Sequence, residues 1–301
     1  MEETLSPPAH RAGFVALIGR PNAGKSTLLN RILGQKIAIV SDKPQTTRTR
    51  ILGIKTLPHA QLMLVDTPGL HDAKDTMNKR MVHVAEQAVL EADLSLWLID
   101  ATRGAEAIDA SIAGLLSRPR VSCCVAINKL DLVPKQAFLP IAAEIGRLLP
   151  ERDVVPISAL TGENVDRLID ILSGLLPEGP ALYPEDDLTD QTERVLAQEI
   201  VREKVFEETH HEVPYSTAVT IDAFEERTDR PVVVIKATIH VERSSQKPIV
   251  IGRRGARLKS IGQKAREEIE RMLERRVFLE LFVRVQEGWT SDVRRLKDFG
   301  L

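Results

Sequence analysis

The sequence predicts two domains, an α/β domain whose mostly parallel sheet has helices on both faces and a smaller α+β domain after it. Over residues 13–176, apolar segments typical of buried strands alternate with segments that repeat apolar residues every three or four positions. After residue 190 the order changes to helix, two strands, two helices and a strand. The length of 301 residues agrees with two domains rather than one.

The first domain is expected to contain six strands and five helices. Strands are predicted over residues 14–18, 51–57, 61–65, 94–100, 121–128 and 153–157, and helices over residues 26–33, 79–91, 108–116, 136–149 and 164–175. Ligands of such a sheet bind at the carboxyl ends of its strands, so the loops after the strands are where a site is expected.

Residues 177–190 are rich in proline and acidic residues, which predicts a linker to a second domain over residues 191–301. There we expect a helix over 191–210 and a hairpin of strands 215–224 and 232–241. A short apolar helix, a glycine pair, a long helix over 257–273 and a strand over 277–285 follow. The acidic N-terminus lacks the apolar segment of a secretion signal, and we expect residues 1–12 to form a disordered tail instead.

Composition favours a cytoplasmic protein with a polyanionic partner. No apolar stretch approaches the ~18–20 residues of a membrane span. Cys123 and Cys124 are neighbours on a predicted strand and point to opposite faces, so neither a disulfide nor a shared metal is expected. The formal net charge is −2, yet residues 236–301 hold sixteen Lys and Arg against nine Asp and Glu. This basic segment suggests a polyanion as the partner of the second domain.

Residues 19–26 have the P-loop spacing G-x-x-x-x-G-K-S, directly after one predicted strand and before one predicted helix. Backbone N–H groups of such a loop surround phosphates, Lys25 reaches the β- and γ-phosphates, and Ser26 offers its hydroxyl to Mg²⁺. A chance match remains the alternative for this motif taken alone. The expected nucleotide contacts here are Gly19, Arg20, Pro21, Asn22, Ala23, Gly24, Lys25, Ser26 and Thr27.

A second phosphate-facing motif is Asp66-Thr67-Pro68-Gly69, which ends the predicted strand 61–65. Asp66 can hold Mg²⁺ through water, opposite Ser26, and the Gly69 N–H can meet the γ-phosphate. Residues 41–50 are polar and lack periodicity, which indicates a mobile loop whose threonines include one that could complete the Mg²⁺ shell. An ordinary solvated loop is the alternative.

The sequence Asn128-Lys129-Leu130-Asp131, at the end of another predicted strand, indicates guanine as the base. The Asp131 carboxylate can accept two hydrogen bonds from guanine N1–H and its exocyclic amine, a pair that adenine does not offer. The segment Ser158-Ala159-Leu160 could add a backbone N–H for the guanine carbonyl.

Together these motifs resemble the translation-factor-related GTPases, which implies binding of GTP and GDP with Mg²⁺. On this resemblance Lys25, Thr47, Asp66 and Gly69 are the catalytic residues, and Ser26, Thr47 and Asp66 form the metal site. Leu70 stands where better-known members have the glutamine that orients the attacking water. The resemblance therefore implies slow hydrolysis stimulated by K⁺, with Asn22 as a K⁺ ligand. A turn-stabilising role is the alternative for Asn22.

The second domain contains I-G-x-x-G over residues 251–255, before an amphipathic helix. Within the α-β-β-α-α-β order this loop resembles a type II KH domain, an RNA-binding α+β fold in which the G-x-x-G loop clamps about four single-stranded nucleotides. The residues expected to meet RNA are Ile251, Gly252, Arg253, Arg254, Gly255, Arg257 and Lys259. Few aromatic residues are present, so base recognition is expected to use hydrogen bonds and apolar packing more than stacking.

A P-loop GTPase domain followed by a KH domain, with Pro44–Arg48 in the polar loop and Val201–Val205 in the second domain, is similar to the Era-like family of bacterial GTPases. This resemblance implies a monomer that binds 16S rRNA near its 3′ end and assists maturation of the 30S ribosomal subunit. It also implies peripheral association with the cytoplasmic membrane. Two other functions stay open: a membrane-surface signalling GTPase, and a binding module in which GTP hydrolysis is incidental.

Overall fold

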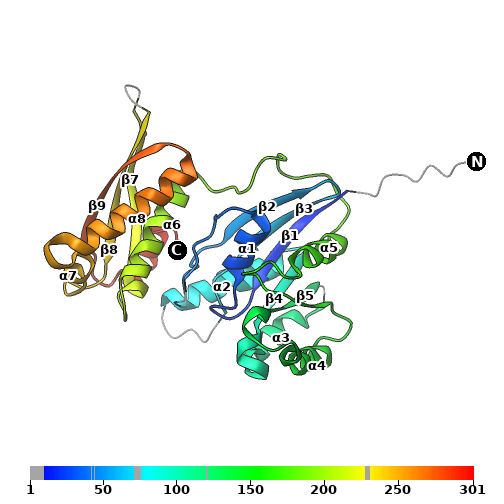
Figure 1. Ribbon diagram of the computed structural model, residues 1–301. Coiled ribbons are helices and arrows are strands. Elements are labelled where there is room, and N and C mark those ends of the chain that lie inside the picture. Colours follow the sequence, from blue (N-terminus) through cyan, green and yellow to red (C-terminus); the bar gives the residue numbers. More distant parts are fainter. Residues whose placement is uncertain (1–9, 42, 44, 71–75, 120, 228–230) are drawn as a thin grey trace, which may run out of the picture. The chain divides into compact units, whose positions relative to one another are not determined.

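The computed structural model describes residues 10–301 except 42, 44, 71–75, 120 and 228–230, and its packing divides the chain into two units (Figure 1). The first unit comprises residues 1–38, 47–72 and 81–190, and the second comprises residues 39–46, 73–80 and 191–301. Residues 1–9 of the predicted tail lie outside the described residues. Strand β1 begins at Arg11, inside the predicted tail, because the Arg11 and Ala12 N–H groups donate to the carbonyls of His59 and Pro177, both at 3.1 Å.

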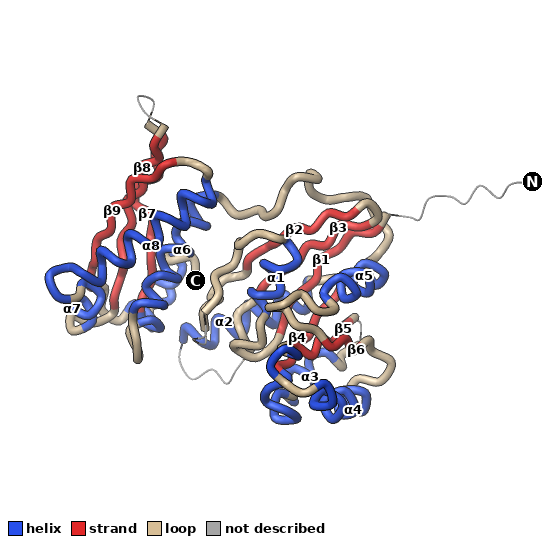
Figure 2. Tube along the Cα trace, in the orientation of Figure 1, coloured by secondary structure: helices blue, strands red, loops and turns tan. Residues whose placement is uncertain are grey.

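The first unit is built on a six-stranded sheet with the strand order β2-β3-β1-β4-β5-β6 (Figure 2). Strands β3 and β4 flank β1, and every neighbouring pair is parallel except β2 with β3, which is antiparallel. The sheet is therefore mostly parallel, as the alternation of strands and helices predicted. The strands are β1 (Arg11–Ile18), β2 (Ile51–Leu57), β3 (Ala60–Asp66), β4 (Leu94–Asp100), β5 (Cys123–Asn128) and β6 (Val154–Pro156).

Helices cover both faces of this sheet. Apolar residues of three helices share one core with Ile18, Trp97 and Ile127 of the strands, and these helices are α2 (Thr76–Glu91), α3 (Ala110–Leu116) and α4 (Phe138–Leu148). The other two helices, α1 (Lys25–Leu33) and α5 (Val165–Leu175), pack against β1, β2 and β3 without entering that core. Successive strand residues point to opposite faces, which places α1 and α5 on the other side. Of these elements, α1 positions the site, because it begins directly after the glycine-rich loop.

Residues 177–190, predicted as a linker, lie along two strands of the first unit. Near their start, the Gly179 N–H donates to the His10 carbonyl at 3.0 Å, and near their end the Ile54 N–H donates to the Leu188 carbonyl at 2.8 Å. The middle of this segment is bonded to Gln61, which is fully buried. Its Oε1 accepts the N–H groups of Leu182 and Tyr183 at 2.7 and 3.0 Å, and its Nε2 donates to the Tyr183 carbonyl at 2.9 Å.

The second unit is a three-stranded sheet with helices against one face. In the order β7-β8-β9, β7 pairs antiparallel and β9 parallel with β8. Inward residues such as Ile235 and Ile239 share a core with α6 and α8. The α-β-β-α-α-β order is as predicted. Its elements are α6 (Glu193–Glu208), β7 (Thr217–Glu226), β8 (Val232–Val241), α7 (Gln246–Ile251), α8 (Ala256–Leu273) and β9 (Arg276–Val285), followed by α9 (Val293–Asp298).

The C-terminal segment is anchored by Trp289. Its side chain is fully buried, packs edge-on against Phe299, and donates its Nε1–H to the Ser216 carbonyl at 3.2 Å. Among the described residues, no helix has both the length and the apolar character needed to cross a membrane.

Replacing Gln61 by Ala should destabilise the first unit by about 2 kcal/mol, because three backbone groups of residues 182 and 183 lose a buried partner. Chemical denaturation followed by circular dichroism measures the change. The matched control is Gln87→Ala, at an exposed position of α2, which should leave the unfolding midpoint in place. Equal midpoints for the two variants would contradict the role given to Gln61.

Candidate functional site

Two glycines let the loop of residues 19–26 pack against the ends of neighbouring strands. Gly19 has φ 151° and Gly24 has φ 96°, values that disfavour other residues. A Cβ atom on Gly19 would lie 2.5 Å from the Leu98 carbonyl oxygen, and one on Gly24 would lie 2.2 Å from Nδ2 of Asn128. The loop can therefore reach β4 and β5 only with glycine at both positions.

Lys25, the first residue of α1, is buried beneath this loop. Its Nζ donates hydrogen bonds to the carbonyls of Gly19 and Arg20, both at 3.2 Å. Burial lowers the pKa of Lys25 to about 8, although the nearby Asp66 carboxylate acts in the opposite direction. The ammonium thus lies inside the curve of the loop, where a phosphate would meet it.

Ser26, Thr47 and Asp66 form a compact oxygen cluster beside Lys25. The Ser26 hydroxyl donates to Asp66 Oδ2 at 2.6 Å, the Thr47 hydroxyl is 3.2 Å from the same oxygen, and the two hydroxyl oxygens are 2.9 Å apart. The other carboxylate oxygen, Oδ1, is buried without a hydrogen-bond partner. Burial raises the pKa of Asp66, against the effects of Lys25 and the two hydroxyls. A carboxylate and two hydroxyls are ligands that suit a hard divalent cation, so these residues fit Mg²⁺.

The segment after β3 approaches the loop closely. A Cβ on Gly69 would lie 2.6 Å from the backbone nitrogen of Pro21, so only glycine fits there. The next residue, Leu70, donates its N–H to the Gly19 carbonyl at 3.0 Å, and its side chain is buried in the core of the first unit. Leu70 therefore has no side-chain group that could orient a water molecule.

Asn128, at the end of β5, connects two further loops. Its Nδ2 donates to the Ala23 carbonyl at 2.8 Å, and its Oδ1 accepts the Ala159 N–H at 2.9 Å. The Asp131 carboxylate is exposed, and its Oδ1 accepts the Ser158 hydroxyl at 2.6 Å. Apart from Thr47, which precedes β2, the predicted phosphate and base residues of the first unit therefore converge at the carboxyl ends of β1, β3, β5 and β6.

Four supporting contacts escaped the sequence analysis. Lys129 Nζ donates to Asp100 Oδ2 at 2.6 Å, Arg20 pairs with Asp109 at 2.8 Å, and Arg31 Nε donates to the Ala159 carbonyl at 3.2 Å. Arg31 also donates to the Leu160 carbonyl. Asp100 carried a usable signal, because it ends a predicted strand as Asp66 does. Arg31 and Asp109 carried none.

Asp100 is held as a carboxylate by its neighbours. Partial burial raises its pKa, but hydrogen bonds from Lys129 and Thr102 more than offset this, so the pKa lies below its usual range. Asp100 pairs with Asn128 across β4 and β5, so its carboxylate lies close to the next residue, Lys129. Lys129 has φ 70°, and its hydrogen bond to Asp100 holds its side chain in place.

In the second unit, the predicted RNA loop joins α7 to α8. Gly252 and Gly255 have φ values of 74° and 80°, and a Cβ on Gly252 would lie 2.7 Å from Cβ of Arg257. Arg257 donates a hydrogen bond to the Ile249 carbonyl and so braces the loop. The side chains of Arg253, Arg254 and Lys259 are exposed, which leaves three cations accessible to a phosphate backbone.

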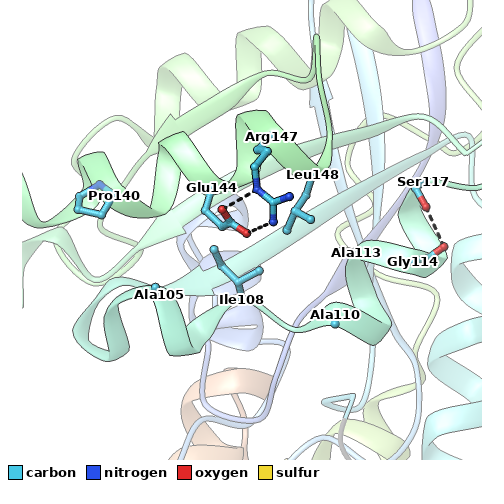
Figure 3. Close-up of a pocket in the computed structure, with 10 residues that line it drawn as sticks. All are labelled: Ala105, Ile108, Ala110, Ala113, Gly114, Ser117, Pro140, Glu144, Arg147 and Leu148. Atoms are coloured by element: carbon cyan, nitrogen blue, oxygen red, sulfur yellow. Dashed lines mark hydrogen bonds and ion pairs between the residues drawn. The ribbon is translucent and has the colours of Figure 1, made fainter.

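A separate pocket of about 710 Å³ lies between the turn η1 (Ala101–Ala107), α3 and α4 (Figure 3). Its only charged lining residues, Glu144 and Arg147, bond to each other at 2.6 and 3.0 Å. None of the predicted site residues lines it. The lining residues are Ala105, Ile108, Ala110, Ala113, Gly114, Ser117, Pro140, Glu144, Arg147 and Leu148.

Comparison with known proteins assigns the chain to a family. The profile described as "50S ribosome-binding GTPase" matches residues 14–129, and the profile of the KH domain matches residues 212–290. GTPase Era of Geotalea daltonii is 52% identical over 289 residues, which cover 96% of this chain and 97% of the relative. GTPase Era of Geobacter metallireducens is 52% identical over 296 residues, which cover 98% and 99%. The chain belongs to the Era family of GTPases.

Solved structures of Era share the fold of both units. A crystal structure of Aquifex aeolicus Era bound to GDP and AlF4⁻ matches with a TM-score of 0.93 and 44% identity, covering 96% of this chain and 99% of that one. Era in complex with MgGDPNP and nucleotides 1506–1542 of 16S ribosomal RNA matches with the same TM-score and identity, covering 97% and 99%. As a member of the Era family, the chain is a GTPase with a C-terminal KH domain.

Arg31→Met should weaken guanine-nucleotide affinity about three- to tenfold, because the carbonyls of residues 159 and 160 lose their guanidinium partner and the base-side loop loosens. Titration with a fluorescent GDP analogue measures this, and Arg167→Met, at an exposed arginine of α5, is the matched control. Unchanged affinity in Arg31→Met would show that the loop does not need this support.

Proposed function

We propose that this Era-family GTPase binds GTP and GDP with Mg²⁺, hydrolyses GTP slowly, and binds 16S rRNA near its 3′ end while assisting maturation of the 30S subunit. The observation that carries the nucleotide part is the Ser26–Thr47–Asp66 cluster, whose buried Asp66 Oδ1 has no hydrogen-bond partner. The RNA part is supported by the exposed cations of the G-x-x-G loop and by the relative described with 16S rRNA nucleotides.

Each predicted residue then has a defined task. The loop of residues 19–26 surrounds the phosphates, Lys25 contacts the β- and γ-phosphates, and the Gly69 N–H meets the γ-phosphate. Ser26, Thr47 and Asp66 would hold Mg²⁺, which when bound neutralises charge that develops on the phosphates. Asp131 accepts the guanine donors, and the backbone of residues 158–160 faces the guanine carbonyl.

The buried Leu70 leaves the attacking water without the usual glutamine, which agrees with slow turnover. We propose that K⁺ bound by Asn22 supplies positive charge near the reacting phosphates. Asn22 has φ 63° and an exposed side chain at the tip of the loop, which agrees with this role and also with that of a turn residue.

GTP hydrolysis should run about ten times faster in KCl than in NaCl at equal ionic strength, because a cation near the phosphates acts where an arginine finger would, and such a finger gives about 10³–10⁵-fold. Phosphate release measures the rate. Asn22→Ala should remove the difference between the two salts, and Asn164→Ala, which also replaces an asparagine with positive φ, is the control. Equal rates in the two salts would refute the K⁺ proposal and leave the Mg²⁺ site unaffected.

The G-x-x-G loop is proposed to clamp the RNA backbone. Gly252 and Gly255 let the main chain approach the phosphates, and Arg253, Arg254 and Lys259 provide positive charge at the start of α8. Arg257 would act mainly by holding the loop through the Ile249 carbonyl.

The double variant Arg253→Glu/Arg254→Glu should bind an RNA of 16S nucleotides 1506–1542 about 100-fold more weakly, because two phosphate contacts become repulsive. Fluorescence anisotropy measures affinity, and GTP binding should stay unchanged. The control, Arg266→Glu/Arg271→Glu, makes the same charge change at exposed positions of α8. Equal losses in both variants would indicate general charge attraction instead of a KH contact.

The remaining proposed partners can each be tested with the same protein. Sedimentation with isolated subunits should show binding to the 30S subunit over the 50S subunit, although the matched GTPase profile is described as 50S ribosome-binding. We infer a cytoplasmic monomer from the family resemblance. Co-flotation with anionic vesicles tests peripheral membrane association, and vesicle binding without RNA binding would favour the membrane-signalling alternative. GTP hydrolysis unaffected by cognate RNA would favour a binding module in which hydrolysis is incidental.

A further inference from the structure

Arg20, the second residue of the loop of residues 19–26, is bonded through its side chain to the segment that leads into α3. Its Nε donates to Asp109 Oδ2 at 2.8 Å, and its Nη1 donates to the Glu106 carbonyl at 3.3 Å. The Asp109 side chain is only 15% exposed, so the pair is partly shielded from water and salt. Two acceptors on one planar guanidinium fix its direction as well as its distance.

Asp109 is itself held in place by the fold of the first unit. Its other oxygen, Oδ1, accepts the N–H groups of Ser111 and Ile112 at 3.0 and 3.4 Å and so caps α3. Partial burial raises the pKa of Asp109, but hydrogen bonds from Arg20 and from these N–H groups more than offset this, so the pKa lies below its usual range. Ile112 and Leu116 of α3 are buried in the core. The position of the carboxylate is therefore set by the core.

The main chain of Arg20 is an acceptor for the groups inside the loop. Its carbonyl oxygen accepts the Ala23 N–H at 3.2 Å, which closes a turn, and it also accepts Nζ of Lys25 at 3.2 Å. It is thus one of the two carbonyls that hold the buried ammonium, together with that of Gly19. Because the anchored side chain and this carbonyl belong to the same residue, a shift of the anchor shifts an acceptor of Lys25.

We propose that Asp109 is a positioning residue for GTP hydrolysis, which acts through Arg20 to hold the Lys25 ammonium where the β- and γ-phosphates meet it. The proposal rests on the proposed role of this loop in binding phosphates. It extends that role to a residue 89 positions away in the chain, in the same unit. Many backbone N–H groups share the binding of the phosphates, whereas charge that develops during the reaction depends on the placement of Lys25, so the rate should be affected more than the affinity.

The test uses Asp109→Asn, because asparagine caps a helix as well as aspartate does but loses the charge that Arg20 pairs with. Its kcat, counted per GDP-binding site, should fall about fivefold, with the KM for GTP changed less than about twofold. Asp166→Asn, at an exposed carboxylate in the first turn of α5, is the matched control and should hydrolyse GTP as the parent protein does. Equal kcat in the two variants would overturn the proposal.

A double-mutant cycle shows whether Asp109 acts through Arg20. In an Arg20→Met background, Asp109→Asn should change kcat by less than about twofold, because the contact it weakens is already lost. Arg20→Lys should retain part of the rate that Arg20→Met loses, since it keeps the charge without the second donor. Losses that multiply in the double variant would overturn the proposed route through Arg20.

A readout without nucleotide separates positioning from the capping of α3. In the nucleotide-free protein, hydrogen–deuterium exchange of the Ala23 amide should quicken about fivefold in Asp109→Asn, while protection in β4 and the unfolding midpoint stay at the parent values. If Asp109 only capped α3, Ala23 would exchange at the parent rate in this variant, and that result would overturn the proposal.

Lys25→Met distinguishes failure of this proposal from failure of the proposed phosphate site. If Lys25→Met binds and hydrolyses GTP as the parent protein does, the role given to the loop is wrong and the positioning role falls with it. If Lys25→Met loses hydrolysis and Asp109→Asn keeps the parent kcat, only the positioning role is wrong.

Discussion

The buried carboxamide of Asn128 is the contact that joins the loops of the proposed nucleotide site. One of its atoms donates to Ala23 in the loop after β1, and the other accepts from Ala159 in the loop after β6. Asn128 itself ends the fully buried strand β5, which lies between β4 and β6, so both loops are held to the sheet. Residue 24 must be glycine because any Cβ there would strike this amide. The loops proposed to face the phosphates and the base are therefore joined through one side chain.

Burial also sets the charge arrangement around the loop. It lowers the pKa of Lys25 and raises that of Asp66, so each group is shifted toward its neutral form despite the attraction between them. Groups in this condition interact strongly with a counter-charge brought into the same low-dielectric surroundings. An anion beside Lys25 and a cation beside Asp66 satisfy both at once, which is the charge order of a phosphate chain with its Mg²⁺.

Much of the fold could be predicted because apolar runs with sharp polar boundaries define strands. Strands 51–57, 94–100 and 232–241 agree to the residue. Helix ends were less accurate, since they depend on local turns: the helix predicted from residue 136 begins at Phe138, after a short 3₁₀ turn. The motifs of the proposed site could be predicted to lie together because parallel topology gathers strand-end residues at one edge. Contacts such as Arg31 with Ala159 join residues 128 positions apart, and no local spacing encodes them.

Residues 177–190, which follow α5, cover the edge of the first unit's sheet, and the strand order alone does not show this. Strand β2 is at the end of the sheet, where main-chain groups would be open to pairing with a strand of another molecule. The Ile54 N–H donates to the Leu188 carbonyl at 2.8 Å, and the Thr189 hydroxyl donates to the Leu52 carbonyl at 2.6 Å. An irregular stretch of chain thus occupies the positions that a foreign strand would use. This edge of the sheet is therefore shielded against pairing with another molecule by a stretch that contains no strand or helix.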